Sequence, residues 1–231
     1  MAGKKYQDAT RRYDRTAEHE PSHALDLVKT LASAKFDESV EITVRLGVDP
    51  RKADQMVRGT VALPSGTGQD VRVAVFAEGD AAAAAEAAGA DEVGGADLAA
   101  RIEGGFTDFD IAIATPEMMP IVGKLGRVLG PRGLMPNPKS GTVTPDVGKA
   151  VVEFKGGKVE YRTDKFANVA LAIGKASFEV ADLSVNFTTV IEELERARPA
   201  SAKGRYIKKV TLSSTMGPGV RVDLGSLKPA P

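Results

Sequence analysis

The sequence predicts a two-domain α/β protein: an open-faced α+β sandwich built from both chain ends, with a second α/β domain inserted between them. Short apolar runs alternate with helix-forming segments in the middle third, whereas the flanks carry strands of alternating polarity. Glycine-rich segments at 64–68 and 155–158 bracket the middle, as expected of linkers. We therefore assign residues 1–66 and 158–231 to one discontinuous domain and residues 67–157 to the inserted domain. Two consecutive domains are the alternative, but each flank would then be short of a core.

The clearest strand prediction in the flanks is residues 38–46. One side of this strand is apolar and the other is polar, because Val40, Ile42, Val44 and Leu46 alternate with Glu41, Thr43 and Arg45. That pattern is typical of an antiparallel sheet with one buried face and one open face. A helix at 185–198 would bury an apolar side made of Phe187, Val190, Ile191 and Leu194. The other elements expected in the flanks are a helix at 22–34 and strands at 59–63, 158–162, 169–173 and 206–214.

In the middle third the expected elements alternate between strand and helix. The helix at 81–88 is nearly all alanine, a strong helix former, and Gly89 ends it. Strands are expected at 71–77, near 92–93 and at 109–114, and further helices at 97–103 and from Thr115 to about Leu129. This order favours a small, mostly parallel sheet covered by helices, which is a Rossmann-like three-layer α/β domain.

The composition is ordinary for a globular protein, with 42% hydrophobic and 27% charged residues. The absence of cysteine excludes disulfides and cysteine-ligated zinc, and it fits a reducing compartment. The N-terminus lacks the apolar run of a secretory signal, and no run is long enough to span a bilayer. We therefore expect a cytoplasmic location and no membrane partner.

The formal net charge of zero conceals a strong segregation of charge. Residues 70–110 hold ten acidic residues against Arg72 and Arg101, a net charge of −8. Residues 199–231 hold six basic residues, Lys228 among them, against one acidic residue, a net charge of +5. An acidic body with basic faces is common among nucleic-acid-binding proteins, although ordinary surface variation could produce any single window of this kind.

Residues 121–143 form a second basic region, with five glycines, three prolines and no acidic residue. Glycine allows a backbone to approach a partner closely, and proline restricts how the loop is presented. A polyanion is the favoured neighbour of its four cations, which are Lys124, Arg127, Arg132 and Lys139. A solvated flexible loop is the alternative. Residues 130–133 match the GXXG loop of one RNA-binding module, but the prolines that follow exclude that module's second helix.

The C-terminal strand carries the other feature typical of a binding surface. Strict alternation would place five residues on one strand face: Ile207, Lys209, Thr211, Ser213 and Thr215. Hydroxyl groups, a cation and the bare backbone that follows at 216–219 suit contacts to phosphates and ribose 2′-hydroxyls. Lys35 and Phe36, at the start of another strand, could add a cation and an aromatic surface. An ordinary edge strand rich in threonine and serine is the alternative.

No motif in the chain supports catalysis or a cofactor. Residues 19–23, His-Glu-Pro-Ser-His, match the HExxH pattern of zinc peptidases, which requires both histidines on one helix. Pro21 is favourable only in the first turn of a helix, so the helix should begin there and leave His19 outside it. No glycine-rich nucleotide motif follows a strand. We expect no metal, cofactor or small-molecule substrate, and an α/β enzyme that binds a phosphorylated ligand is the alternative.

The stretch Gly123-Lys-Leu-Gly-Arg-Val-Leu-Gly-Pro-Arg-Gly-Leu-Met-Pro-Asn-Pro-Lys-Ser-Gly-Thr-Val143 resembles the motif of one family, bacterial large-subunit ribosomal protein one. Further blocks resemble the same family in the same order, at 35–41, 57–64, 174–178 and 213–218. The resemblance therefore covers nearly the whole chain, which makes it far more specific than any single motif.

The resemblance implies a function that composition and periodicity do not provide. Members of the family bind a stem-loop of large-subunit (23S) rRNA through the discontinuous domain, as part of the 50S subunit, and form the mobile stalk at the E site. They contact deacylated tRNA and aid its release, and in many bacteria they repress translation by binding their own operon's mRNA. Carried over by position, the implied RNA contacts are Lys35, Phe36, Ser39, Glu41, Lys165, Ser213, Thr215, Met216 and Gly217. One departure from the family pattern is the apolar character of residues 164–173 around Lys165.

Overall fold

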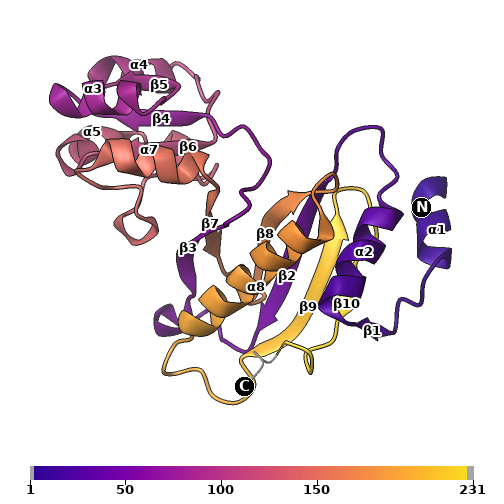
Figure 1. The fold of residues 1–231 in the computed structure, drawn as a ribbon. Coiled ribbons are helices and arrows are strands. Elements are labelled where there is room, and N and C mark those ends of the chain that lie inside the picture. The colour runs from indigo at the N-terminus through magenta and orange to yellow at the C-terminus, as the bar shows by residue number, and fades with distance from the viewer. Residues whose placement is uncertain (1–2, 228–231) are drawn as a thin grey trace. The chain divides into compact units, whose positions relative to one another are not determined.

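The computed structural model describes residues 3–227, and within it the chain divides into two compact units (Figure 1). One unit combines the chain up to Gly68 with the chain from Val159 onward, and the other spans Gln69–Lys158. Both units contain helices and strands, which confirms the expected mixed α/β fold. Lys228, which was counted in the basic C-terminal segment, lies outside the described residues.

A five-stranded sheet forms the centre of the discontinuous unit. Its strands lie in the order β1 (Glu18–His19), β10 (Val220–Val222), β9 (Ile207–Ser214), β2 (Ser39–Leu46) and β8 (Asn168–Lys175). All neighbours are antiparallel except β1 and β10. The central strand β2 therefore comes from the N-terminal segment, whereas both of its neighbours come from the C-terminal segment.

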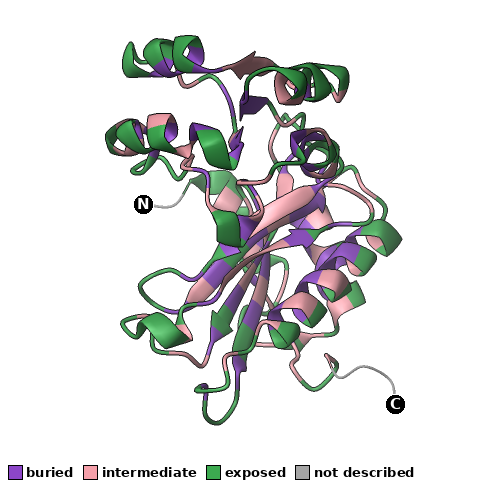
Figure 2. Cartoon of the chain, turned by 90° about the vertical axis from the view of Figure 1, so that its left-hand side faces the viewer, coloured by how far each residue is buried: buried purple, intermediate pink, exposed green. Residues whose placement is uncertain are grey.

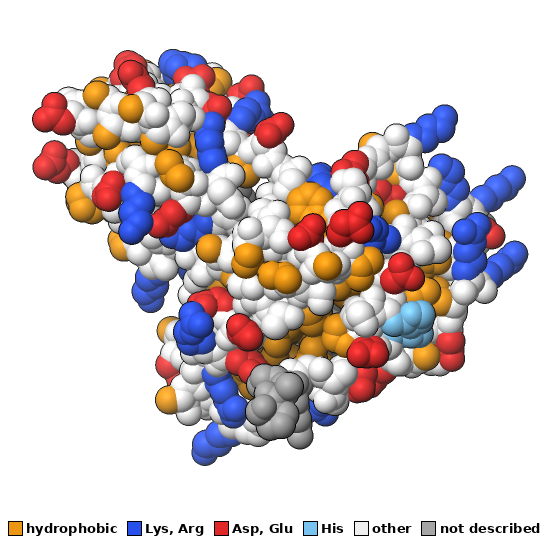
Figure 3. Space-filling view, viewed as in Figure 1, with side chains coloured by type: hydrophobic (Ala, Val, Ile, Leu, Met, Phe, Trp, Pro, Cys, Tyr) orange, Lys and Arg blue, Asp and Glu red, His pale blue; other side chains and the backbone are white. Residues whose placement is uncertain are grey.

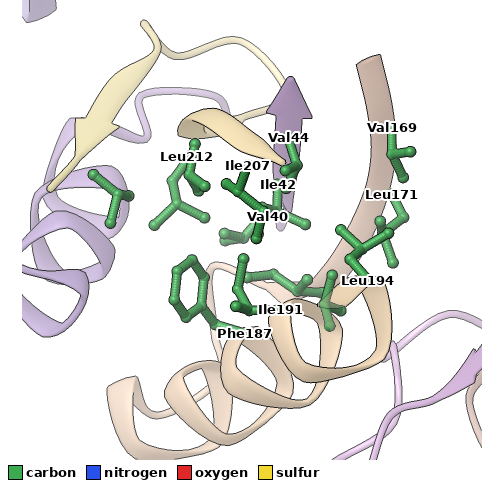
Figure 4. Close-up of a cluster of buried hydrophobic side chains, with 14 of the residues drawn as sticks. Val40, Ile42, Val44, Val169, Leu171, Phe187, Ile191, Leu194, Ile207 and Leu212 are labelled. Atoms are coloured by element: carbon green, nitrogen blue, oxygen red, sulfur yellow. The ribbon is translucent and has the colours of Figure 1, made fainter. Parts of the chain in front are cut away.

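Helices α2 (Pro21–Leu31) and α8 (Val180–Arg196) cover one face of this sheet (Figure 1). The alternation in β2 places its apolar side chains on the face that these helices cover. Val40, Ile42 and Val44 are fully buried there, whereas the residues between them are not. Figure 4 shows these side chains meeting Phe187, Ile191 and Leu194 of α8. Along the strands, buried and less buried residues alternate (Figure 2). The predicted apolar sides of this strand and this helix are thereby confirmed.

The prediction of strict alternation along the C-terminal strand is wrong at Ile207. The pairing of β9 with β2 shifts register between Arg45 and Leu46, because Arg45 pairs with Lys209 and Leu46 with Ile207. The extra residue is Lys208, so that Ile207 turns to the buried face and is 9% exposed. A bulge of this kind reverses the side-chain direction for every residue beyond it.

The inserted unit contains a three-stranded parallel sheet in the order β5 (Glu92–Gly94), β4 (Val73–Phe76) and β6 (Ile111–Ala114). Alternate residues of β4 enter two separate apolar clusters, one on each face of the sheet. On one face pack α4 (Ala96–Glu103), α5 (Met119–Lys124) and α6 (Gly126–Leu129), and on the other pack α3 (Asp80–Ala87) and α7 (Val147–Lys155).

One expectation for the inserted unit needs correction, and one of its helices was not predicted. The helix expected from Thr115 to Leu129 is divided into a 3-10 turn (Pro116–Met118), α5 and α6, since Gly123 and Gly126 weaken helix propensity there. Helix α7 was not predicted, although Asp146 caps it by accepting a hydrogen bond from the Lys149 N–H. An added Cβ at Gly148 would lie 3.3 Å from the Ala84 carbonyl oxygen, so glycine permits the close packing of α7 on α3.

The remaining described elements are short or lie at the edges of the discontinuous unit. No helix within residues 3–227 is long and apolar enough to cross a membrane. Three elements, α1 (Lys4–Arg11), β1 and β10, were not predicted from the sequence. A separate two-stranded sheet pairs β3 (Arg58–Ala62) with β7 (Lys158–Arg162), and further 3-10 turns lie at Ala53–Gln55 and Pro138–Ser140.

A buried amide fixes the chain where it leaves the discontinuous unit. The fully buried Asn186 of α8 donates to the carbonyl oxygens of Gly66 (2.9 Å) and Ile173 (2.8 Å). Its own side-chain oxygen accepts a hydrogen bond from the Ser65 N–H (3.1 Å). One buried side chain therefore provides hydrogen-bond partners for three backbone groups in two segments.

Replacing Asn186 by alanine should lower the free energy of unfolding of this unit by about 2–3 kcal/mol, because buried backbone groups lose their partners. Urea unfolding followed by far-ultraviolet circular dichroism measures the change. Thr188→Ala is the matched control, since its hydroxyl lies on the exposed side of the same helix and bonds only Ser184 O. Equal losses for the two variants would contradict the role given to Asn186.

Candidate nucleic-acid interface

The sheet face opposite α2 and α8 is polar and remains accessible. We call it the open face and define it by the polar residues Ser39, Glu41, Thr43, Arg45, Lys209, Thr211, Ser213 and Arg221 with Ala170 and Ala172. Each of these residues is half-buried or exposed, and none is buried. This accessibility distinguishes the open face from the helix-covered face, where the alternate residues of the same strands are sealed.

Strand register arranges the open face in rows across the sheet. In one row Thr43 pairs with Thr211 on one side and Ala170 on the other, and Arg221 lies beyond Thr211. In the next row Glu41 pairs with Ser213 and Ala172, and in another Arg45 pairs with Lys209 and Asn168. Hydroxyls therefore occupy the centre of the face, small alanines one side, and cations its other margins.

A shallow cleft of about 570 Å³ opens where β9 meets β10 and the segment before β1. Its lining combines hydroxyl groups with three cations: Arg15, Thr16, Lys209, Thr211, Gly219 and Arg221. Among the described residues, no ion pair with a carboxylate involves Arg15, Lys209 or Arg221. Cations without acidic partners attract an anionic ligand. Arg15 and Arg221 were not among the predicted site residues, although Arg221 alternates with the buried Val220 and Val222.

At one end of the open face, a buried carboxylate joins two loops. Glu38 is 1% exposed, and one of its oxygens accepts hydrogen bonds from the N–H groups of Ser33 (2.8 Å) and Ala34 (2.7 Å). The other oxygen accepts from the Met216 N–H at 2.9 Å. We call residues 33–38 and 214–217, joined in this way, the Glu38 junction. Glu38 was not among the predicted site residues, because burial of a glutamate depends on partners distant in the chain.

The electrostatics of Glu38 reflect this position. Burial disfavours its charged form and by itself would raise the pKa of the carboxyl group. Hydrogen bonds from the N–H groups of Met216, Ala34 and Ser33 outweigh burial, so the pKa lies below the ordinary value of 4.5. The junction is therefore held by an ionised carboxylate at neutral pH.

The junction brings together most of the residues implied by the family resemblance. Thr215 Oγ1 lies 3.0 Å from the Ser39 backbone N and accepts its hydrogen bond, so this hydroxyl links the turn to the start of β2. Lys175 Nζ donates to Ser39 Oγ at 2.9 Å. A Cβ on Gly217 would lie 2.3 Å from Ser214 Oγ, which shows how tightly the turn packs. Lys35 is exposed nearby in the chain, and Phe36 and Met216 are 57% and 60% exposed.

Lys165 lies away from this group. It precedes β8, whose first residue Asn168 pairs with Arg45, whereas the last residue, Lys175, pairs with Ser39. The six residue-to-residue steps from Ser39 to Arg45 correspond to about 20 Å along a strand. Lys165 is exposed, and its Nζ lies 5.1 Å from the centroid of the Phe166 ring, which is itself 65% exposed. The structure therefore places Lys165 at the opposite end of the open face from the Glu38 junction.

The glycine- and proline-rich loop within the basic region 121–143 belongs to the inserted unit and has a defined structure. Leu134 and Met135 pack against an apolar cluster of that unit, and the Asn137 N–H donates to Thr142 Oγ1 at 2.8 Å. The buried Ser140 hydroxyl donates to the Asn137 carbonyl oxygen at 3.1 Å. The four predicted cations, Lys124, Arg127, Arg132 and Lys139, are all exposed, and the Arg132 guanidinium bonds Thr107 Oγ1.

The histidine pair does not form the arrangement that its HExxH pattern would require. His19 is the last residue of β1, and α2 begins at Pro21, as predicted from the sequence. The two imidazole centroids lie 5.3 Å apart, with His19 also 6.5 Å from the Tyr13 ring. The histidines therefore lie on different elements, not one turn apart on a single helix.

Comparison with known proteins identifies the class to which this fold and this surface belong. Residues 27–218 match the model of the Ribosomal protein L1p/L10e family. The chain is 60% identical over 222 residues to the large ribosomal subunit protein uL1 of Mycobacteroides abscessus, covering 96% of this chain and 94% of that protein. It is 57% identical to the uL1 protein of Clavibacter sepedonicus over 224 residues, covering 97% and 98% of the two chains. The chain therefore belongs to the Ribosomal protein L1p/L10e family, a family of ribosomal proteins and not of enzymes.

Glu38→Gln should lower the free energy of unfolding at pH 7 by about 2–4 kcal/mol, because backbone N–H groups lose a charged acceptor. The pKa of Glu38 is lower in the folded than in the unfolded chain, so its contribution is present above pH 4.5. The same contribution is lost as the pH falls through the folded-state pKa. Urea unfolding between pH 7 and pH 3 should therefore show the gap between variant and parent closing below about pH 4.5.

Glu41→Gln is the matched control for this prediction. Glu41 is an exposed carboxylate of β2, three residues after Glu38 in the chain, and its removal should change stability little. A gap between Glu38→Gln and the parent that stays constant with pH would contradict the charged role of Glu38.

Proposed function

We propose that this chain is a structural protein of the large ribosomal subunit that binds a 23S rRNA stem-loop through its discontinuous unit. Membership of a ribosomal protein family supports the ribosomal role. The observation that carries the RNA-binding proposal is a sheet face left uncovered by helices, bordered by unpaired cations and ending in the Glu38 junction. A soluble protein has no other evident reason to leave hydroxyls, cations and large apolar side chains together on one surface.

Each group on this surface has a role suited to RNA. Cations at the margins attract phosphates, a contribution that depends on salt and not on sequence. The hydroxyls of Ser39 and Ser213 suit phosphate oxygens and ribose 2′-hydroxyls, and Glu41 can accept hydrogen bonds from a base amino group or a 2′-hydroxyl. Phe36 and Met216 offer apolar surface to unstacked bases. Lys35, Thr215 and Gly217 complete the contacts at the junction, with Thr215 also fixing the shape of the turn.

The position of Lys165 affects the size of the RNA that this proposal requires. Lys165 and the Glu38 junction lie at opposite ends of the open face. An RNA that contacts both must extend about 20 Å along the strands. A folded stem-loop satisfies this condition, whereas a short single strand bound only at the junction does not.

The proposal extends to the position of the protein in translation. We infer a cytoplasmic, ribosomal location and a mobile stalk at the E site that contacts deacylated tRNA and aids its release. The same open face would bind a similar structure in the protein's own operon mRNA and so repress translation. Lys124, Arg127, Arg132 and Lys139 would form a secondary basic surface on the inserted unit, not needed for the rRNA stem-loop.

Lys209→Ala and Arg221→Ala, each made alone, should weaken binding of the 23S rRNA stem-loop. Each should also reduce the slope of log affinity against log salt concentration by about one, because one phosphate contact is lost. Filter binding at several salt concentrations measures both quantities. Arg196→Ala is the control, since this exposed arginine ends α8 on the covered side of the sheet. If the salt dependence of affinity had the same slope in all three variants, the placement of the RNA on the open face would be refuted.

Replacing Lys124, Arg127, Arg132 and Lys139 together by alanine should leave the affinity for the rRNA stem-loop unchanged. This variant removes the charges of the loop while keeping the partly buried Leu134 and Met135, which pack against an apolar cluster of the inserted unit, and the buried Ser140. Deleting the loop would be a poorer test because it would also remove these packing contacts. Affinity abolished in a variant with an unaltered circular dichroism spectrum would assign rRNA binding to the inserted unit instead.

A further inference from the structure

An apolar hollow of about 620 Å³ lies beside the Glu38 junction. One wall consists of residues 3–6, at the start of α1, and the other of Ser33, Ala34, Phe36 and Met216 from the two loops of the junction. Its size falls within the range of about 300–1,000 Å³ that is typical of sites for small molecules or parts of larger ones. The hollow is therefore large enough to receive a planar group.

The hollow exposes large apolar side chains of a kind that is usually buried. Phe36 is 57% exposed and Met216 60%, and both rank among the few large hydrophobic side chains in residues 3–227 that are exposed. Exposed apolar surface in a confined, rimmed site indicates a ligand. An aromatic ring and a thioether both make favourable contacts with the face of a flat π-system.

The α1 wall is fixed in place by contacts along its length. Lys5 Nζ donates to the Ser33 carbonyl oxygen at 3.0 Å, so the helix is attached to the junction loop itself. Ala9 is 5% exposed in the main apolar cluster of the unit. After the helix, the Tyr13 hydroxyl donates to the Gly219 carbonyl oxygen at 3.0 Å. The hollow is thus part of the fold and does not depend on a loosely attached segment.

Positive charge surrounds the hollow. Lys and Arg side chains gather over α1 in Figure 3. Lys4 and Lys5 line the hollow and Lys35 adjoins Phe36 in the chain, while Asp8, the one acidic residue of α1, forms an ion pair with Arg12. The two acidic residues of the junction are also engaged, since Glu38 is buried and Asp37 accepts from the Ser177 N–H and hydroxyl. An apolar interior with a cationic rim is complementary to a nucleobase that carries its phosphate.

We propose that this hollow, which we call the α1 pocket, holds one unpaired nucleobase of the bound RNA. The base lies against Phe36 and Met216, and Tyr6 and Lys4 close the pocket from the side of α1. Lys4, Lys5 and Lys35 attract the phosphates on either side of that nucleotide. The inference rests on the proposed RNA-binding function and adds to it an element outside the segment matched to the family model, which begins at residue 27.

The test uses the full-length protein with methionine methyl groups labelled with ¹³C. The probe is a hexa-adenylate RNA, and the reference probe is a sugar-phosphate oligomer of the same length without bases. Hexa-adenylate should shift the Met216 methyl resonance upfield through the ring current of the stacked base. Met56 is the internal control, since its side chain is 41% exposed but lies outside the pocket, and its resonance should not move. Met216→Leu identifies the resonance.

Variants then relate the pocket to binding of the 23S rRNA stem-loop. Phe36→Leu keeps an apolar side chain but removes the ring, and it should weaken binding about tenfold, the range expected for loss of one stacked base. Lys4→Ala with Lys5→Ala should weaken binding more than Arg11→Ala with Arg12→Ala, an equal loss of charge at the other end of α1. Circular dichroism confirms that α1 and the sheet remain folded in each variant.

The outcomes separate this inference from the proposed function. If the parent protein binds the stem-loop but Met216 does not respond to hexa-adenylate and Phe36→Leu binds normally, the pocket is wrong and the RNA-binding function stands. If the parent protein does not bind the stem-loop, the proposed function itself fails. An equal shift with the base-free oligomer, or a shift with an acidic peptide and none with RNA, would also overturn the pocket.

Discussion

The pairing of β2 with β8 and β9 is the constraint on which the discontinuous unit depends. The central strand of the sheet ends at Leu46, whereas its two neighbours begin at Asn168 and Ile207. The sheet can therefore form only once the whole inserted unit is present in the chain, and pairing between such distant segments is expected to slow folding more than to lower stability. The register of this pairing is equally important, because a slip of one residue would turn Glu41 and Thr43 into the core and Ile42 toward water.

The Glu38 junction fixes the shape of the surface at one end of this sheet. A buried carboxylate that accepts three backbone hydrogen bonds holds the loop before β2 against the turn after β9, together with the hydrogen bond between Thr215 and Ser39. Burial of a charge is unfavourable unless hydrogen bonds compensate for it, and here the bonds outweigh the burial. The exposed Phe36 and Met216 are presented on rigid supports, which reduces the entropy lost on binding a ligand.

The fold of the discontinuous unit brings basic segments from both ends of the chain into one unit. The basic C-terminal segment supplies Lys209 and Arg221, and the N-terminal region supplies Arg15 and the lysines of α1. The ends of the chain thus contribute cations to neighbouring parts of one unit. The acidic residues counted at 70–110 belong to the inserted unit, where several, including Asp91 and Glu92, form ion pairs with local cations.

Local sequence patterns were sufficient to predict several features of the secondary structure and of the buried faces. The alternation in β2, the apolar side of α8 and the helix start at Pro21 depend only on residues close in the chain, and all three appear as predicted. Helix α7 escaped prediction because Gly148 lowers the helix propensity of its segment, and only packing against α3 explains the glycine. The tertiary structure alone decided that Ile207 is buried, that Glu38 joins two loops and that Lys165 lies at the far end of the open face. These features arise from register and hydrogen bonds between segments more than a hundred residues apart, which no local pattern encodes.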